Sequence, residues 1–247
     1  MLSAGSGTRL RPLSAVRPKP LCTVGGVALL DLALGRVAAL APSVAVNVRH
    51  HAEAVAAHVA GRGVHVSDER AHPEPLGTAG AVAALRPWLD GRAVLVVNGD
   101  TWTDVALEPL LDGWDGERVR VLVHGPPGTE LVPGAGIVAS LVPAADVAAL
   151  PLAPLGLSNG LWWPAQREGR LDSLAGDGRF LPCDTPRDYL AANLQASGGE
   201  SVLEPGARVE PGAEVVRSVV WRDAVVPAGE VLVDAVRYLG SSTVLVR

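Results

Sequence analysis

The stretch that decides the fold is the amino terminus, Met1-Leu-Ser-Ala-Gly-Ser-Gly-Thr-Arg-Leu-Arg-Pro-Leu-Ser-Ala-Val-Arg-Pro-Lys-Pro20. Its first part is a loop of small residues. Glycines there let a ligand approach the backbone closely, and successive exposed amides form a cradle for anionic oxygens. The candidates for this cradle are Ala4, Gly5, Gly7 and Thr8. The loop therefore predicts a phosphate site.

Two cationic side chains complete the predicted phosphate site. Arg9 can hold a phosphate through two parallel hydrogen bonds, and Lys19 supplies a compact point charge. Lys19 is the only lysine among the 21 lysines and arginines of the chain, which indicates a chemical reason for lysine at this position. Pro18 and Pro20 hold it on a stiff, extended segment.

Spacing excludes two common phosphate motifs. From Gly5 the sequence reads G-S-G-T-R-L, which lacks the third glycine or alanine of the dinucleotide fingerprint, and no G-x-x-x-x-G-K-[ST] occurs. The residues instead resemble the signature of the sugar-nucleotide pyrophosphorylases, the nucleotidyltransferases that make NDP-sugars. That signature is roughly A-G-x-G-T-R-L-x-P-L-(T/S), followed by P-K-P. Residues 4–14 and 18–20 match it position by position.

Composition narrows the class of protein. The chain has 247 residues, of which 48% are hydrophobic, and a net charge of −5. This length allows one large domain, or one domain with a small appendage. Arginines do not cluster, which argues against nucleic-acid binding, and no apolar run is long enough to span a membrane. Because the phosphate loop follows Met1 directly, we expect no signal peptide, and two cysteines fit a reducing compartment, so we expect a cytoplasmic protein.

Helical segments alternate with short β-branched runs in the first half of the chain. We expect helices over 28–40 and 53–60 and strands over 43–48 and 64–67, the order typical of a mostly parallel sheet with helices on its faces. Together with the resemblance, this implies an α/β fold, a Rossmann-like three-layer nucleotidyltransferase (GT-A-like) sandwich. Because so little chain precedes the loop, we expect a truncated first strand and a translation start further upstream.

A second segment with the family's character is Glu74-Pro-Leu-Gly-Thr-Ala-Gly-Ala81. Thr78 can begin a helix there, and the glycines give access to the backbone. The segment is similar to the family's L-G-T-A-G-A, which meets the nucleotide base. The resemblance therefore makes Gly77, Thr78 and Gly80 base-binding candidates, against the alternative of a plain helix start rich in small residues.

Asp100 is the first candidate ligand for Mg²⁺. It follows the apolar run at 93–97, and ligands of open α/β sheets bind beyond the carboxyl ends of their strands. A carboxylate facing a triphosphate at that edge is suited to Mg²⁺. The resemblance places the family's first metal-binding aspartate at this position.

Asp184 is the second candidate ligand, and here the chain departs from the family. The stretch Phe180-Leu-Pro-Cys-Asp-Thr-Pro-Arg-Asp-Tyr-Leu190 is similar to the family's D-x-G-T-P-x-x-Y-L. Aligning the two puts Pro182 at the ligand aspartate and Asp184 at the glycine. Residues two apart on a strand are separated by about 6.5 Å, so Asp184 replaces the ligand only if the backbone shifts. Thr185 is predicted to cap a helix that reaches Ala196.

The last fifty residues have a different character. The runs 202–207, 209–213 and 225–229 place aliphatic residues before turns rich in Pro and Gly, which predicts hexapeptide-like coils of a β-helix. We therefore divide the chain into a nucleotidyltransferase domain at 1–197 and a short β-helix-like tail at 198–247. The tail is too short for an acyltransferase domain. It either caps the first domain or contacts another subunit in a homo-oligomer.

The resemblance implies a reaction in which an NTP and a sugar 1-phosphate give an NDP-sugar and pyrophosphate, with Mg²⁺ as cofactor. Arg9 would hold the departing pyrophosphate, and Lys19 would neutralise charge at the reacting centre. The L-G-T-A-G segment favours the mannose-1-phosphate guanylyltransferases, while thymidylyl- and uridylyltransferases, one of them acting on N-acetylmuramate 1-phosphate, stay open. The alternative from another class is a nucleotide-sugar-binding regulatory subunit without catalysis, which Pro182 and the expected loss of most of the first strand favour.

Overall fold

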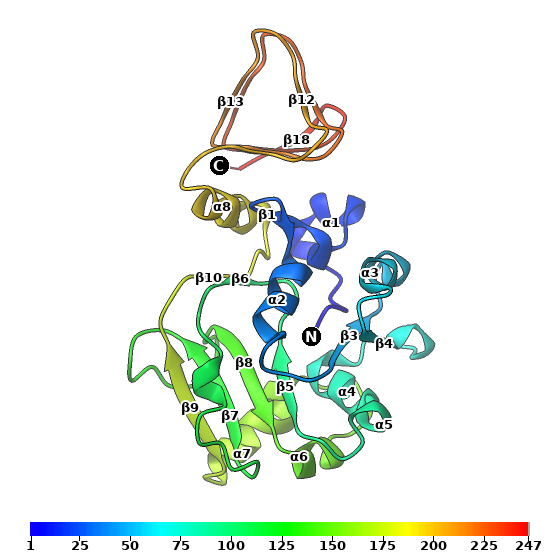
Figure 1. The fold of residues 1–247 in the computed structure, drawn as a ribbon, viewed down its shortest axis with the longest axis vertical. Helices are drawn as coiled ribbons and strands as arrows, with labels where there is room; N and C mark the ends of the chain where they lie inside the picture. The colour runs from blue at the N-terminus through cyan, green and yellow to red at the C-terminus, as the bar shows by residue number, and fades with distance from the viewer. Residues whose placement is uncertain (247) are drawn as a thin grey trace. The chain divides into compact units, whose positions relative to one another are not determined.

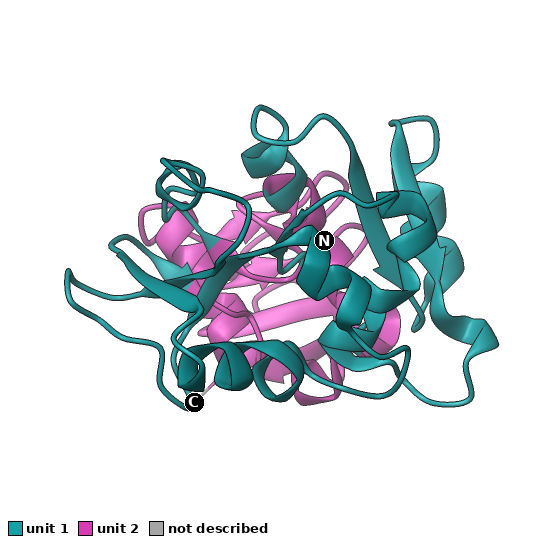
Figure 2. Ribbon diagram, turned by 90° about the horizontal axis from the view of Figure 1, so that it is seen from below, with its two compact units in different colours: residues 1–5, 33–99, 103–180 teal, residues 6–32, 100–102, 181–247 magenta. Residues whose placement is uncertain are grey.

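A computed structural model describes residues 1–246. The chain forms two compact units. Unit 1 comprises residues 1–5, 33–99 and 103–180, and unit 2 comprises residues 6–32, 100–102 and 181–247 (Figure 2). The boundary predicted after residue 197 therefore lies inside unit 2. Among the described residues, the structure contains no helix that is long and apolar enough to cross a membrane.

The main sheet of unit 1 has four strands in the order β5-β8-β7-β9 (Figure 1). Their bounds are β5 (Val94–Val97), β7 (Val119–His124), β8 (Ile137–Val142) and β9 (Leu171–Gly176). β8 is antiparallel to both neighbours, whereas β7 and β9 are parallel. The sheet is therefore mixed, and the expectation of a mostly parallel sheet was wrong here. The loop between β7 and β8 carries no crossover helix, which a parallel pair would need.

A second, parallel pair in unit 1 consists of β3 (Val44–Val48) and β4 (Val64–Asp68). Met1 and Leu2 connect this pair to the main sheet. The Met1 amine donates to Ala45 O (2.9 Å), and the Leu2 amide donates to Val97 O (2.9 Å). These two residues thus occupy the position of a strand between β3 and β5.

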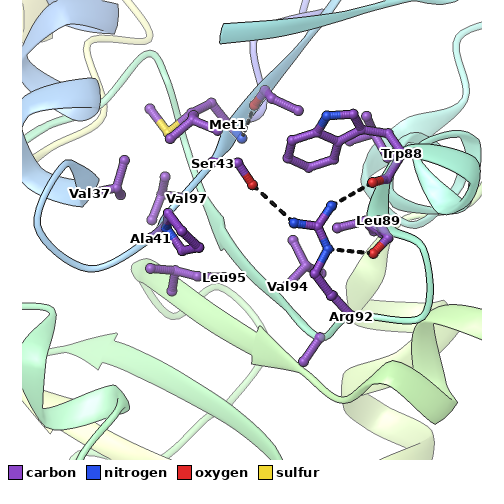
Figure 3. A pocket seen from close by; sticks show the side chains of 15 residues that line it. Met1, Val37, Ala41, Ser43, Trp88, Leu89, Arg92, Val94, Leu95 and Val97 are labelled. Carbon is purple, nitrogen blue, oxygen red and sulfur yellow. Dashed lines mark hydrogen bonds between the residues drawn. The ribbon is translucent and has the colours of Figure 1, made fainter. Parts of the chain in front are cut away.

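A cavity of about 130 Å³ lies beside Met1 in unit 1 (Figure 3). Its walls come from the end of the helix at 29–37, from β3, from β5 and from the segment at 85–92. Val37, Val97 and Leu95 are among the apolar residues that line it, and Arg92 closes one side by bonding to Ser43 Oγ (3.2 Å) and Trp88 O (2.7 Å). The space continues the line of Met1 between the two strands.

Side chains on both faces of β7, in the main sheet, are buried. On β7, Val119, Val121 and Val123 pack in one apolar cluster and Leu122 packs in another, as the two-residue period of a strand requires. The helices of the chain in this half are α2 (Leu29–Val37), α3 (Ala52–Val59), α4 (Gly77–Ala84), α5 (Arg86–Leu89), α6 (Ala144–Ala149) and α7 (Trp163–Arg167). The helices and strands expected over the first seventy residues are confirmed to within three residues at each end.

Unit 2 joins the signature segment to the carboxyl-terminal part of the chain. It holds α1 (Leu13–Val16), the hairpin of β1 (Thr23–Val24) and β2 (Val27–Ala28), and α8 (Pro186–Ala196). β6 (Trp102–Thr103) and β10 (Phe180–Leu181) form a two-stranded sheet. One buried cluster contains Leu13 from α1, Tyr189 from α8 and Trp221 from the tail. The signature and the tail thus share a core.

The tail consists of short strands that stack with a period of 17 residues, the separation that links Ser218 N to Ser201 Oγ. The strands are β11 (Val202–Leu203), β12 (Arg208–Val209), β13 (Glu214–Val216), β14 (Val219–Val220), β15 (Val225–Val226), β16 (Val231–Val233), β17 (Ala235–Leu239) and β18 (Ser242–Leu245). Each of β11, β12 and β13 pairs in parallel with the strand one turn later, which gives the triangular outline at the top of Figure 1. β18 ends the stack as an antiparallel partner of β17.

Candidate functional site

Four of the predicted site residues meet in unit 2. The Lys19 ammonium lies 2.9 Å from Asp100 Oδ2 and 2.7 Å from Asp184 Oδ1. Arg9 Nη2 lies 3.0 Å from Asp184 Oδ2. The two predicted cations and the two predicted metal ligands therefore form one connected ion cluster. We call these four residues the Lys19 cluster.

Lys19 is the buried centre of this cluster. Its side chain is 7% exposed, against 27% for Asp100 and 25% for Asp184, whereas Arg9 is 72% exposed. Burial works against the charge on Lys19, but the attraction of Asp100 and the hydrogen bond to Asp184 outweigh it, so the pKa of the ammonium lies above its ordinary value. Lys19 is thus a buried positive charge held between two carboxylates. Arg9 adds a second positive charge at the surface, beside Asp184.

Local structure explains how Lys19 is placed. It begins a single 3₁₀ turn, Lys19–Leu21, which closes with a bond from Cys22 N to Lys19 O (3.0 Å). Pro18 precedes it in an extended conformation, with φ −56° and ψ 139°. The proline rings limit the backbone on both sides of the lysine, so its position depends on where the flanking residues are held.

Asp184 follows a residue with an unusual backbone conformation. Cys183 is buried and has φ +50°, in the left-handed region that few residues other than glycine adopt. Asp184, the next residue, contacts Lys19 and Arg9. Thr185 then caps α8, accepting from Asp188 N (3.1 Å) while Asp188 Oδ2 accepts from Thr185 N (3.0 Å), so the predicted cap is confirmed.

The phosphate-loop candidates lie at or near the surface. In unit 1, Gly5 is exposed and Ala4 is half-buried. In unit 2, Thr8 is exposed and Gly7 has φ +59°. A Cβ on Gly7 would lie 3.1 Å from Ser14 Cβ, and Ser14 Oγ donates to Gly7 O (2.6 Å). Conformation and space both require glycine at this position.

The base-binding candidates lie at the start of α4, in unit 1. Their backbone packs against the segment at 153–157: Ala79 N donates to Leu155 O (2.9 Å), and Thr78 Oγ1 accepts from Leu157 N (2.7 Å). A Cβ on Gly77 would lie 2.6 Å from Leu155 O, and one on Gly80 would meet Ala153 O. The small residues here allow two backbone segments to approach closely, which is a structural reason for them that involves no ligand. Their role toward a nucleotide base stays a prediction.

Several residues that hold the site were missed in the sequence. Glu204 in the tail accepts hydrogen bonds from Arg17, Thr23 and Arg222 N. The sequence around Glu204 predicts only a turn of a β-helix. In unit 1, Ser3 N donates to Asn47 Oδ1 (2.7 Å), and Asn47 Nδ2 donates to the buried carboxylate of Glu69 (2.7 Å). No motif in the neighbouring sequence predicts the role of these polar residues, because their partners are distant in the chain.

The Lys19 cluster has the donors that Mg²⁺ prefers. Its two partly exposed carboxylates already direct oxygens at one cation, and Mg²⁺ in phosphate-handling sites is held by one or two carboxylates together with phosphate oxygens. Asp100 and Asp184 are the residues that would hold it. Within residues 1–246, no group of three or more His, Cys, Asp or Glu side chains forms a metal site made by protein alone.

Residues 1–125 match the family model described as nucleotidyl transferase. The chain belongs to this family. Over 133 residues it is 38% identical to an N-acetylmuramate alpha-1-phosphate uridylyltransferase of Caulobacter vibrioides, covering 49% of this chain and 54% of the relative. Over 131 residues it is 33% identical to a mannose-1-phosphate guanylyltransferase of Mycobacterium tuberculosis, covering 50% of this chain and 35% of the relative. The chain thus spans about half the length of these curated relatives, or less.

The likeness of fold to a solved structure covers more of the chain than the sequence matches do. A crystal structure described as a mannose-1-phosphate geranyltransferase from Thermus thermophilus superposes with a TM-score of 0.71 at 21% identity, covering 99% of this chain and 93% of that one. At this identity the comparison shows the fold alone. It supports the α/β nucleotidyltransferase fold for the chain.

Proposed function

We propose that this member of the nucleotidyl transferase family is an enzyme that makes an NDP-sugar and pyrophosphate from an NTP and a sugar 1-phosphate. The observation that carries the proposal is the Lys19 cluster. A buried ammonium, two carboxylates suited to Mg²⁺ and an exposed arginine lie together. Arg9, Lys19 and Asp100 match the family's pattern, whereas Asp184 stands two residues beyond the position of its second aspartate. Nucleotidyl transfer needs such a concentration of placed charge, because its transition state develops charge on phosphate oxygens.

In the proposed reaction, an oxygen of the sugar 1-phosphate forms a bond to the α-phosphorus of the NTP. The bond from that phosphorus to the β-phosphate bridge breaks, and pyrophosphate leaves with the electron pair. Lys19 lowers the energy of the charged phosphates at the reacting centre, and Arg9 binds the departing pyrophosphate. Ala4, Gly5, Gly7 and Thr8 cradle the nucleotide phosphates, while Gly77, Thr78 and Gly80 border the base. Bound Mg²⁺ supplies further neutralisation of phosphate charge.

The names of the relatives suggest which substrates to try first. The Caulobacter relative is named as a uridylyltransferase, which favours UTP and N-acetylmuramate 1-phosphate as the first pair. The L-G-T-A-G segment and the Mycobacterium relative favour GTP and mannose 1-phosphate as the second. Both pairs need the same phosphate chemistry from the Lys19 cluster, so the cluster does not choose between them. We propose that the tail is a short β-helix that contributes to the core of unit 2. We further propose that it contacts a second subunit.

The second candidate function is a nucleotide-sugar-binding regulatory subunit without catalysis. The observation in its favour is Pro182, which stands where the family has an aspartate. The experiment measures pyrophosphate release by the full chain with Mg²⁺, UTP, GTP, dTTP or ATP and a panel of sugar 1-phosphates, with NTP binding followed separately by calorimetry. Release with one pair establishes the enzyme and its substrates. Binding of an NTP without release for any pair overturns the enzymatic proposal and favours the regulatory one.

A further inference from the structure

We propose that Glu204 is a positioning residue, which holds Lys19 in place by fixing Arg17, two residues before it, and Thr23, four residues after it. Glu204 belongs to the first coil of the tail and is 187 residues from Arg17 in the chain. The tail would then be part of the catalytic apparatus of unit 2. The effect on turnover rests on the proposed function, while the effect on Lys19 itself does not.

The Glu204 carboxylate is fully used by its neighbours. Arg17 donates two parallel hydrogen bonds, Nη1 to Oε1 (2.6 Å) and Nη2 to Oε2 (2.9 Å). Thr23 Oγ1 donates to Oε1 (2.5 Å) and Arg222 N donates to Oε2 (2.8 Å). Burial works to raise the pKa of Glu204, but the hydrogen bonds from Arg17 and Thr23 outweigh it and hold that pKa below its ordinary value. The contact is thus a charged, bidentate pair with fixed geometry.

The connection from Arg17 to Lys19 is short and stiff. Pro18 alone separates the two residues, and its ring fixes φ. A displacement of the Arg17 backbone would therefore displace Lys19 by a similar amount. On the other side, Thr23 is tied to the same carboxylate, so that the segment from 17 to 23 is held at both ends by one side chain.

The tail also holds the opposite side of the Lys19 cluster. The Arg17 guanidinium carbon lies 4.0 Å from the ring centre of Trp221, and Trp221 Nε1 donates to the Tyr189 hydroxyl (2.9 Å). Tyr189 is on α8, whose cap Thr185 directly follows Asp184. Glu204 and Trp221 thus connect the segment that carries Lys19 with the helix that follows its partner Asp184. These contacts therefore connect the segment of Lys19 with that of Asp184 through the tail.

The test uses Glu204→Gln in the full chain and reads Lys19 directly. Because Lys19 is the only lysine, peptide mapping of the protein after reaction with an amine-selective acylating reagent reports the accessibility of its side chain. We expect Glu204→Gln to raise the rate at which Lys19 is labelled by several-fold at pH 8. Asp234→Asn is the matched control, since it breaks the exposed pair with Arg217 that also joins two coils of the tail. It should leave the rate unchanged.

Turnover provides the second measurement. A residue that orients a ligand of a cation site typically changes affinity or activity by about 10- to 100-fold. For Glu204→Gln we expect a fall of this size in kcat and a higher Mg²⁺ concentration for half-maximal rate, with a smaller change in KM for the NTP. A residue that only stabilises the fold would lower the unfolding temperature and leave kcat of the folded protein as it was. If the wild type releases no pyrophosphate, the proposed function fails and the labelling result still decides the role of Glu204.

A milder variant covers the case in which Glu204→Gln does not fold. Thr23→Val removes one hydrogen bond to Glu204 and keeps the shape of the side chain. It should raise Lys19 labelling in the same direction and to a smaller extent. If folded Glu204→Gln, or folded Thr23→Val when the first variant does not fold, labels at the rate of wild type, the proposal is overturned.

Discussion

Lys19 Nζ and Asp184 Oδ1 lie 2.7 Å apart, although 165 residues separate them in the chain. Their contact answers the main question that the sequence raised. This chain has Pro182 where the family pattern has an aspartate, and the carboxylate that contacts Lys19 comes from two residues later. Cys183, just before Asp184, has a left-handed conformation, and the candidate site has two carboxylates on one lysine.

Asp184→Asn tests whether this carboxylate serves the reaction. Without its charge, Lys19 keeps only Asp100, and the candidate Mg²⁺ site loses one of its two anionic oxygen donors. We expect kcat for pyrophosphate release to fall by about 10- to 100-fold and the Mg²⁺ requirement to rise. Asp104→Asn, which removes an exposed pair with Arg179, should leave both unchanged. Equal kinetics for wild type and Asp184→Asn would exclude Asp184 from the site.

The pH dependence of stability tests the charge on Lys19. Its pKa in the folded protein lies above the ordinary value of 10.5, so the ion pairs stabilise the fold fully below that pH and lose this effect as the pH rises through the folded pKa. Lys19→Met removes the titrating group. The gap in urea midpoint between wild type and Lys19→Met should therefore be largest near pH 8 and shrink above pH 10.5. A constant gap across this range would mean that Lys19 does not carry the charge.

Gly7→Ala and Gly5→Ala form a matched pair within the phosphate loop. Gly7 has φ +59° and Ser14 Cβ would lie 3.1 Å from an added Cβ, whereas an added Cβ on Gly5 meets nothing within 4 Å. A left-handed conformation alone costs about 1–2 kcal/mol for residues other than glycine. We expect Gly7→Ala to lower the free energy of unfolding by at least this amount and Gly5→Ala to change it little. Chemical denaturation of both variants measures the difference, and equal midpoints would contradict it.

The cavity beside Met1 predicts a stabilising substitution. Val97 is 3% exposed and lines this space, so Val97→Ile adds a methylene group where there is room for it (Figure 3). Filling a cavity commonly raises the free energy of unfolding by about 0.5–2 kcal/mol. Val216→Ile, at an exposed strand position, is the control and should have no effect. A lower melting temperature for Val97→Ile would show that the wall cannot accept the larger side chain.

The parts of the site that follow from local sequence could be predicted. The aspartate after β5 and the capped helix behind Asp184 each depend on a few consecutive residues, and both are found as expected. The predicted loop extends only to Gly7, because Thr8–Leu10, which includes Arg9, is a 3₁₀ helix. The order of the sheet could not be predicted in the same way, because β8 pairs with β5 and β7 through contacts far apart in sequence.

The supports of the site were beyond the reach of the sequence. Cysteine has no preference for a left-handed conformation, so the turn at Cys183 is imposed by its surroundings and no local pattern announces it. Glu204 likewise stands in a turn that resembles the other coils of the tail. Only the fold shows that its carboxylate meets Arg17, 187 residues earlier.

The period of 17 residues in the tail limits which insertions and deletions this protein can accept during evolution. A coil of fixed length keeps Glu204 and Trp221 in register with the signature segment, so one inserted or deleted residue between them would shift one anchor against the other. Substitutions on the outward-facing strands carry no such penalty. The exposed residues of the tail should therefore vary among relatives while its length stays constant. A chimaera in which another β-helix replaces the tail must carry residues equivalent to Glu204 and Trp221 to remain active.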